Sequence, residues 1–318
     1  MKSSVTRYAA KRILQLIPIL IAITFLSFAM IRLAGSDVVL QRMESTGQVL
    51  NQQIIDAERA RLGIDKPFLV QYGTWFSRLL SGDMGTSFVT GKPVFSVFIS
   101  KLPATLLLAF ASVALTVVVS IPLGVLAAVR QGRLTDLLIR FSSFVGNSMP
   151  NFFVALLLMY VFSIRLKMLP VISRNTGALG CILPAATLAV AMSAKYLRQV
   201  RATVLDELGR DYVDAARARG VRFRTVLTAS VLKSCMVTIV TLLMLSIGSL
   251  LGGTAIVESI FMWDGVGKLA VDAITMRDYP LIQAYVMWMS IVFVMVNLIA
   301  DISYRAIDPR VRMSGGRS

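Results

Sequence analysis

The stretch Asp211–Gly220 reads DYVDAARARG, and it stands between two of the most apolar segments of the chain. Small, charged and apolar residues recur here at helical spacing, which predicts a helix from about Ala202 to Arg219. Gly220 suits the position just beyond a helix end, where glycine readily adopts a positive φ. What such a charged helix does depends on the apolar segments around it.

The composition of those surroundings indicates an integral membrane protein. Of the 318 residues 56% are hydrophobic, and the mean hydropathy is +0.73. The sequence contains no histidine, which excludes imidazole metal ligands and Ser–His catalysis. Cys181 and Cys235 fall at the ends of different apolar runs, so neither a disulfide framework nor a cysteine-based zinc site is expected.

Six apolar runs approach the roughly 20 residues that a membrane-spanning helix needs. They lie at about 13–31, 103–129, 141–164, 182–197, 236–257 and 282–304. The first is longer than the apolar part of a signal peptide, and we interpret it as a retained anchor. The fourth is short and interrupted by polar residues. The sequence therefore predicts an all-α integral membrane protein with six transmembrane helices.

The basic residues predict the orientation of these spans. Lys and Arg are roughly twice as dense in the segments that a cytoplasmic N-terminus places inside, although Arg165, Lys167 and Arg174 fall outside. The predicted order is a cytoplasmic N-terminus (1–12), transmembrane helix 1 (13–31), an external insertion (32–101), transmembrane helices 2–6 (102–304) with a cytoplasmic loop at 198–233, and a cytoplasmic C-terminus (305–318).

The external insertion is too long for a simple turn. Its stretch 51–63 reads as an amphipathic helix ended by Gly63. A second helix follows, with Asp65 as the predicted N-cap, Pro67 near the first turn and an apolar stripe. We expect a small helical subdomain between transmembrane helices 1 and 2.

The motifs of nucleotide and ion chemistry are missing from the sequence. Neither Gly–Lys pair, at 91–92 or 267–268, belongs to a Gly-x4-Gly-Lys-Ser/Thr phosphate loop. We therefore expect no catalytic residue, no metal site and no cofactor bound by this chain. Glu258 and Asp301 lie at span ends, and either local ion pairing or contact with a transported solute would explain them.

Two functions suit the helix at 202–219. It is either a docking element for another protein or an amphipathic helix on anionic lipid. Four acidic residues and the lack of a broad apolar face favour protein docking.

The string DAARARG resembles the EAA loop of ABC-importer permeases, a cytoplasmic helix that fits a groove on the ATP-binding subunit. Asp replaces the usual Glu, and Met236–Val237 stand where the family has Leu-Pro, a departure that concerns the kink after the loop. The resemblance implies these ATPase-coupling residues: Asp214, Ala215, Ala216, Gly220, Tyr212 and Arg217.

The resemblance extends along nearly the whole chain. The strings QYGTWF, GDMGTSF, LPATLLLA, IPLGVLAA, SMPNFF, LGGTAIVESIFMWDGVGKLAVDAI, RDYP and DPRVR look like the peptide/nickel group of permeases, although AGSDVV replaces the common Pro-Gly-Asp-Pro. This resemblance implies a type I ABC-importer permease in the bacterial inner membrane. The implied partners are a second homologous permease, two ATP-binding subunits that hold ATP and Mg²⁺, and an extracytoplasmic binding protein.

The substrate class stays open between two possibilities. Three strings, QYGTWF, SMPNFF and FMWDGVGKLAV, favour the nickel or metallophore branch, with the metal chelated by a small organic ligand because the chain lacks histidine. A dipeptide or oligopeptide is the first alternative. Outside this family, a stand-alone secondary carrier and a membrane scaffold are the other classes that fit a polytopic chain.

The translocation path is expected near the third and fifth spans. The string GNSMPNFF places helix-disturbing residues in the third span, and such breaks occur where backbone lines a cavity or is buried in protein. A packing kink is the alternative explanation. The candidates for lining the path are Met149, Asn151, Ser246 and Glu258.

Overall fold

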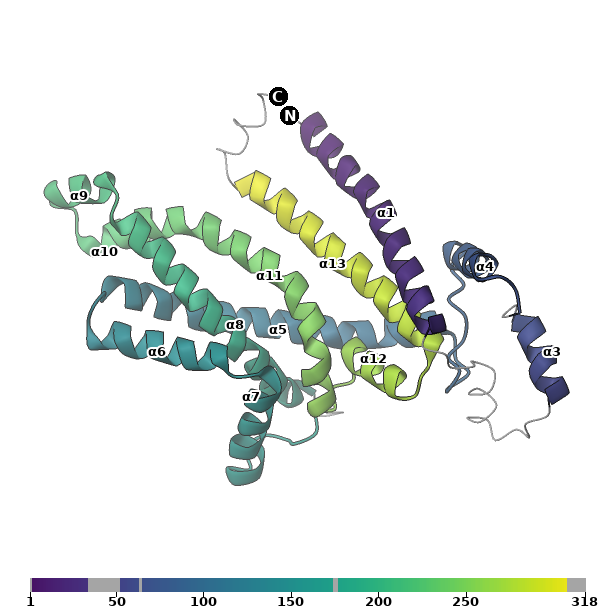
Figure 1. Ribbon diagram of the computed structural model, residues 1–318. Helices are drawn as coiled ribbons and strands as arrows, with labels where there is room; N and C mark the ends of the chain where they lie inside the picture. Colours follow the sequence, from purple (N-terminus) through teal and green to yellow (C-terminus); the bar gives the residue numbers. More distant parts are fainter. Residues whose placement is uncertain (1, 34–51, 63–64, 174–176, 308–318) are drawn as a thin grey trace. The chain divides into compact units, whose positions relative to one another are not determined.

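The structure is a computed structural model that describes residues 2–33, 52–62, 65–173 and 177–307. Helices are the regular elements throughout these ranges, which contain no β-strand (Figure 1). Contacts within the chain divide it into two compact units. One unit is Met1–Pro103 with Gly265–Val292, and the other is Ala104–Asp264 with Phe293–Ser318.

Among the described residues, four helices are long and apolar enough to cross a membrane. They are α5 (Val94–Val129), α8 (Gly177–Leu208), the stretch Phe223–Met244, and Tyr279–Ile299 within α13 (Tyr279–Ile307). A bent helix pair makes a fifth if its halves form one span, and α1 (Lys2–Leu33) has a shorter apolar section, Ile17–Leu33. The all-helical membrane class is confirmed, and the count of six spans stays a prediction.

The third predicted span is broken. Its halves, α6 (Leu134–Ser148) and α7 (Asn151–Leu158) with the π-helical continuation η1 (Met159–Arg165), meet at an angle of 107°. Pro150 explains the break, because a proline ring excludes the preceding residue from helical geometry. Met149 is accordingly extended, with φ −86° and ψ 130°. The break lies inside the string GNSMPNFF, where the sequence predicts one.

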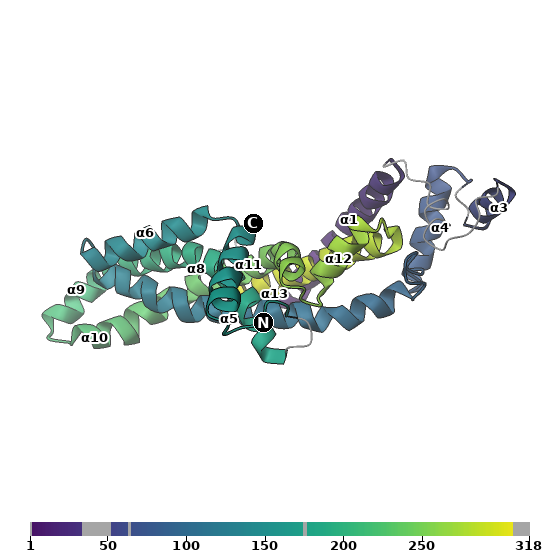
Figure 2. The same cartoon turned by 90° about the horizontal axis from the view of Figure 1, so that it is seen from below.

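The fourth predicted span is longer than the sequence suggests. α8 has 32 residues and continues through Pro184 to Leu208. Its polar residues are tolerated because the helix packs inside its unit: Thr187 is fully buried, and its hydroxyl donates to the Leu183 carbonyl at 2.8 Å. α6 and α8 lie side by side in both views (Figures 1 and 2), joined by a hydrogen bond from Ser143 Oγ to the Ala194 carbonyl.

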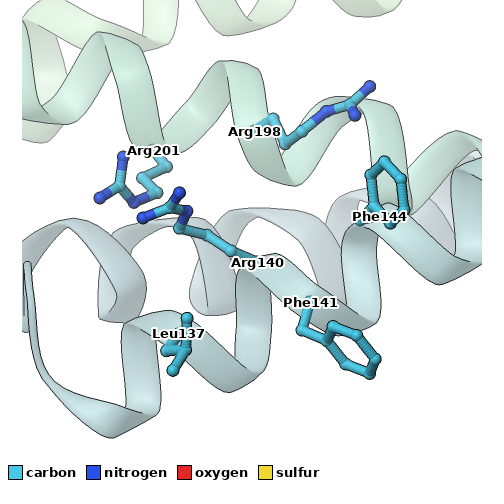
Figure 3. A pocket seen from close by; sticks show the side chains of 6 residues that line it. All are labelled: Leu137, Arg140, Phe141, Phe144, Arg198 and Arg201. Atoms are coloured by element: carbon cyan, nitrogen blue, oxygen red, sulfur yellow. The ribbon is translucent and has the colours of Figure 1, made fainter.

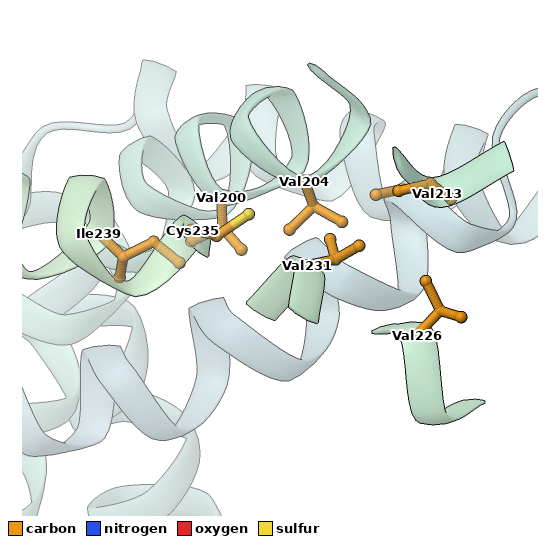
Figure 4. Close-up of a cluster of buried hydrophobic side chains, with 8 residues drawn as sticks. Val200, Val204, Val213, Val226, Val231, Cys235 and Ile239 are labelled. Atoms are coloured by element: carbon orange, nitrogen blue, oxygen red, sulfur yellow. The ribbon is translucent and has the colours of Figure 1, made fainter. Parts of the chain in front are cut away.

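A cluster of small buried side chains joins five segments of the second unit to α5 (Figure 4). Besides α8, these segments are α9 (Asp211–Ala218), α10 (Phe223–Val226), the π-helical η2 (Leu227–Val231) and α11 (Leu232–Ile260). We call it the valine cluster, and its members are Ala128, Val200, Val204, Val213, Val226, Val231, Cys235 and Ile239.

The predicted continuous helix from Ala202 to Arg219 is wrong. α8 ends at Leu208, and α9 begins at Asp211 after a turn in which Arg210 is extended, with ψ 143°. The reason lies in the valine cluster. Val204 and Val213 are nine residues apart, so one unbroken helix would point them to opposite sides. The break lets both side chains enter the same cluster.

In the first unit, α4 (Phe68–Leu80) packs on α1 through aromatic rings. The centroids of Phe25 and Tyr72 are 5.2 Å apart, and those of Phe28 and Phe68 are 5.5 Å apart, both edge to face. Such pairs add to the stability that apolar burial provides. The predicted apolar stripe of this helix therefore covers α1.

Two details of the insertion concern the predicted helix ends. α3 (Gln52–Leu62) occupies the predicted first helix, whose expected end at Gly63 lies outside the described residues. The prediction of Asp65 as the N-cap of the next helix is wrong. Pro67 holds that position, and its carbonyl accepts from the amide N–H groups of Val70 and Gln71 at 2.9 and 3.1 Å. Proline suits this place because its φ is fixed.

The start of α5 is anchored to the loop between α12 (Val266–Thr275) and α13. Asp278, almost fully buried in that loop, accepts hydrogen bonds from the hydroxyl of Ser87 and from the Phe88 amide, the latter at 3.1 Å. The segment 81–93 before α5 is thereby fixed to the first unit.

We expect Gly124→Ala to lower the melting temperature of the purified subunit in detergent. A Cβ at Gly124 of α5 would lie 2.8 Å from the Val200 Cβ and 3.0 Å from the Leu197 carbonyl oxygen of α8. Overpacking of this kind costs about 1–3 kcal/mol. Gly73→Ala in α4 is the matched control, because no atom lies within 4 Å of its Cβ position. Equal melting temperatures for the two variants would contradict this account.

Candidate functional site

The candidate site is α9, a short helix between α8 and α10. Asp211 and Asp214 occupy its first turn, where carboxylates interact favourably with the positive end of the helix dipole. The N-cap residue Arg210 makes no capping hydrogen bond through its side chain. The charge pattern therefore supports a helix that starts at Asp211.

The end of α9 has a defined geometry. Gly220 has φ +80°, and its amide donates to the Arg217 carbonyl at 2.9 Å. The Val221 amide donates to the Ala216 carbonyl at 3.2 Å. These two bonds form a Schellman motif, in which the residue with positive φ is usually glycine. The predicted role of Gly220 just beyond the helix is confirmed.

The two faces of α9 have different surroundings. Val213 is 2% exposed and belongs to the valine cluster, and Ala216 packs against the same cluster. The opposite face carries the exposed residues Asp211, Asp214, Ala215 and Ala218. This outer face is small and acidic, and the inner face is apolar.

The two alanines of the DAARARG string therefore have different positions. The family resemblance implies that Ala215 and Ala216 both take part in ATPase coupling. In the structure Ala215 is exposed, whereas Ala216 is partly buried against the protein's own core. Only Ala215 of this pair lies on the outer face.

Polar side chains on the flanks tie α9 to its neighbours. The Tyr212 hydroxyl donates to Glu207 Oε1 of α8 at 3.0 Å. Desolvation first, and then this contact with a carboxylate, raise the pKa of Tyr212. The Arg217 guanidinium lies 5.8 Å from the ring centroid of Phe223 in α10, within the range of a cation–π contact. Both side chains thus help to fix the orientation of the helix.

After α9 the chain continues to α11 through a π-helical segment. α10 has four residues, and η2 (Leu227–Val231) connects it to α11. A π-helical turn inserts an extra residue into the helical repeat and often marks functional positions. The distortion lies just before Met236–Val237, the pair that replaces the Leu-Pro of the family.

The candidate path residues occupy different places in the second unit. Met149 and Asn151 flank Pro150 at the break between α6 and α7, and both are partly buried. Glu258 lies near the end of α11, away from this break in the sequence, and is fully buried. Ser246 is in α11, but its side chain is outside the described part of the structure. Their role in lining a path stays a prediction.

Glu258 takes part in a junction between α11 and the first residues of α5 in this unit. Its Oε1 accepts from the Thr105 hydroxyl at 2.8 Å. The Trp263 indole N–H donates to the Ala104 carbonyl at 3.0 Å, and the Trp263 amide donates to the Glu258 carbonyl at 2.8 Å. A buried carboxylate is tolerated when it accepts hydrogen bonds, as the Glu258 carboxylate does from the Thr105 hydroxyl.

Comparison with known proteins shows which family the chain belongs to. The sequence profile described as binding-protein-dependent transport system inner membrane component matches residues 120–313, and a profile for the N-terminal part of such membrane components matches residues 5–109. The chain belongs to this family of permeases. The permease is accordingly a multi-pass subunit of an ABC importer in the inner membrane, and it is a transport component rather than an enzyme.

Two curated relatives match the permease over nearly its whole length. It is 39% identical to the oligopeptide transport system permease protein AppB of Bacillus subtilis, with 96% of this chain and 98% of the relative covered. It is 37% identical to the glutathione transport system permease protein GsiC of Salmonella typhimurium, again with 96% and 98% covered. The predicted peptide/nickel type of permease is thereby confirmed.

Solved structures agree on the fold. An inward-facing MetNI methionine ABC transporter has a TM-score of 0.56 at 16% identity, with 66% of the permease and 95% of that chain covered. A structure titled as an amino acid ABC transporter with histidines has a TM-score of 0.51 at 18% identity, with 67% and 94% covered. At these identities the similarity concerns the fold alone.

The sequence did not reveal an ion pair that joins α6 to α8. Asp136, 1% exposed, accepts from Arg201 Nε at 2.7 Å and from Arg201 Nη2 at 2.8 Å, and also from the Gly132 amide at 3.1 Å. The two side chains are 65 positions apart, so no motif spacing relates them. The one available signal was that both lie at predicted cytoplasmic span ends.

We expect Gly220→Ala to loosen α9 without unfolding the subunit. A side chain at φ +80° costs about 1 kcal/mol, so amide hydrogen exchange across 213–219 should become about fivefold faster. Gly209→Ala is the control, because its Cβ meets only ordinary contacts at 3.7 and 3.8 Å. Unchanged exchange in Gly220→Ala would show that the positive φ does not hold this helix end.

Proposed function

We propose that the permease forms half of the import path for small peptides and that an ATP-binding subunit docks on the outer face of α9. The observation that carries this proposal is the division of α9 into two faces. Val213 fixes the inner face to the valine cluster, and Asp211, Asp214 and Ala215 stand exposed on the outer face. A helix supported in this way transmits displacement to the transmembrane helices.

The same two faces argue against the lipid-surface interpretation of this segment. A helix that lies on a membrane inserts a free apolar face among the lipid headgroups. The apolar residue Val213 of α9 is already buried in the protein, and the exposed face carries two carboxylates that anionic lipids would repel. Docking to another protein is therefore the better explanation.

The proposed assembly contains this chain, a second homologous permease, two ATP-binding subunits and an extracytoplasmic binding protein. ATP and Mg²⁺ belong to the ATP-binding subunits in this proposal. Their closure on ATP would draw the two coupling helices together and shift the permeases between inward- and outward-facing states. A nucleotide drives such rigid-body alternation only through different affinities for the two states.

The proposal places α9 and both termini in the cytoplasm. The density of Lys and Arg in the predicted inside segments supports this orientation. The insertion at 32–101, with α3 and α4, would then face the binding protein. Its aromatic packing on α1 gives α4 a fixed position for such a contact.

Peptides are the substrate class that the relatives favour. The two relatives described above are named for oligopeptides and for glutathione, which is a tripeptide. Three sequence strings favour the nickel or metallophore branch of the peptide/nickel permeases. A chelated metal therefore stays an untested alternative substrate. We therefore place small peptides first and use the metal chelate as the competing substrate in the test.

We expect Ala215→Arg to weaken binding of the ATP-binding subunits at least tenfold. The exposed alanine leaves room for a partner surface. An arginine there would fill that room and offset the negative charge of Asp211 and Asp214 that the partner would meet, and such a charge mismatch commonly costs several kcal/mol. Co-purification and transport-linked ATP hydrolysis in proteoliposomes measure the effect. Ala178→Arg, at the other end of α8, is the matched control.

Ala216→Arg is a less specific test, because it would also disturb the valine cluster. Normal association and transport in Ala215→Arg would contradict docking at α9. An equal loss in Ala178→Arg would point to general misassembly instead.

We expect peptides to stimulate ATP hydrolysis by the complete transporter. The assembly with its binding protein is reconstituted in proteoliposomes, and dipeptides, tripeptides including glutathione, and a nickel–histidine chelate are supplied separately. Peptides should stimulate hydrolysis severalfold over the basal rate, and the chelate should not. Stimulation by the chelate alone would overturn the peptide assignment but not the coupling role of α9.

A further inference from the structure

A hollow of about 560 Å³ lies between α6 and α8 in the second unit (Figure 3). Its volume is within the range of roughly 300–1,000 Å³ that is typical of small-molecule sites. Four residues of α6 line it at positions i, i+3, i+4 and i+7, and two residues of α8 line it at i and i+3. They are Leu137, Arg140, Phe141, Phe144, Arg198 and Arg201.

The hollow carries an excess of positive charge. Three of its six lining residues are arginines, and none is acidic. Arg201 is paired with the buried Asp136. Neither Arg140 nor Arg198 forms an ion pair within the described residues, and Figure 3 shows Arg140 and Arg201 pointing toward one another across the gap. Three guanidiniums against one carboxylate leave two positive charges to be neutralised.

The rest of the lining is apolar and exposed. Phe141 and Phe144 are each 64% exposed, and Leu137 is 59% exposed. Phe141 and Phe144 lie within the third predicted span, so hydrocarbon is the natural neighbour for their exposed surface. The hollow thus combines cationic groups with an apolar rim along the same helix face.

The hollow is placed at the membrane boundary by the sequence. Arg140 directly precedes the third predicted span, and Arg198 directly follows the fourth. Phe141 and Phe144 continue from Arg140 into the span. An arginine at a boundary reaches a headgroup phosphate, and the aromatic residues beyond it contact the acyl chains.

We propose that this hollow binds an anionic phospholipid whose acyl chains lie along Phe141 and Phe144. Its phosphate would be bound by Arg140 and by Arg198, whose side chain points away from Arg140 in Figure 3 and would turn toward the phosphate on binding. Arginine is suited to this role because its planar guanidinium binds phosphate oxygens through two parallel hydrogen bonds. Basic pockets between transmembrane helices are known to suit phospholipid headgroups.

The lipid would belong to the cytoplasmic leaflet, because the hollow and α9 share one end of α8; this placement rests on the proposed function. Arg201 is seven residues from Leu208, or about 10 Å along the helix. A lipid in the hollow would therefore neutralise charge close to the docking helix. A second permease helix is the competing occupant, but an apolar span would leave the two surplus guanidiniums without a counterion.

The test uses the purified permease without ATP-binding subunits, in detergent micelles containing either phosphatidylglycerol or phosphatidylcholine. Native mass spectrometry measures the lipid retained, and thermal unfolding measures the protection. Phosphatidylglycerol should be retained and should raise the melting temperature, whereas phosphatidylcholine and free glycerophosphate should not. In the double variant Arg140→Gln/Arg198→Gln the apparent affinity for phosphatidylglycerol should fall about tenfold to thirtyfold.

The matched control is Arg222→Gln/Arg224→Gln, which removes two exposed positive charges near α10 and leaves the hollow intact. It should retain phosphatidylglycerol like the unaltered permease. Equal loss in both double variants, or no loss in either, would overturn the proposal. So would unchanged lipid retention in Arg140→Gln/Arg198→Gln together with weaker association of the second permease. None of these readouts depends on docking of the ATP-binding subunits. A failure of the lipid proposal can therefore be distinguished from a failure of the docking proposal.

Discussion

The burial of Val213 in the valine cluster is the contact on which the behaviour of α9 depends. The helix has eight residues, and Val213 is its one fully buried side chain. Its neighbours in the cluster come from α8, from α10 and η2, and from α11. Because protein interiors are close-packed and transmit strain, α9 cannot move without moving these helices or opening the cluster. A force on its outer face therefore reaches the membrane-spanning segments.

α8 connects this cluster to the rest of the second unit. It contributes Val200 and Val204 to the valine cluster, and one helical face away it holds Arg201 against Asp136 of α6. A buried ion pair of this kind is costly to break, because the remaining charge loses its partner. The close approach of Gly124 on α5 fixes a third helix to the same element. α9, the Asp136–Arg201 ion pair and the hollow between α6 and α8 thus share one rigid support.

Two helix distortions lie on either side of α8, and one of them lies close to the point where the chain departs from its family. The Leu-Pro that follows the coupling loop in the family is replaced by Met236–Val237, yet the chain is distorted nearby through the π-helical Leu227–Val231. The third span is bent by 107° at Pro150. A proline and a π-helical turn are both recognised causes of helix distortion. The helices on either side of α8 are therefore both irregular, one because of a proline and the other because of a π-helical turn.

The sequence by itself determined the membrane class, the positions of the apolar runs, the break at Pro150 and the helix end at Gly220. These features follow from composition, or from the conformational limits of one residue and its neighbours. The tertiary structure decided that α8 stops at Leu208, that Ala216 faces inward while Ala215 faces outward, and that Asp136 pairs with Arg201. Each of these depends on contacts between residues far apart in the chain, and no local pattern specifies such contacts.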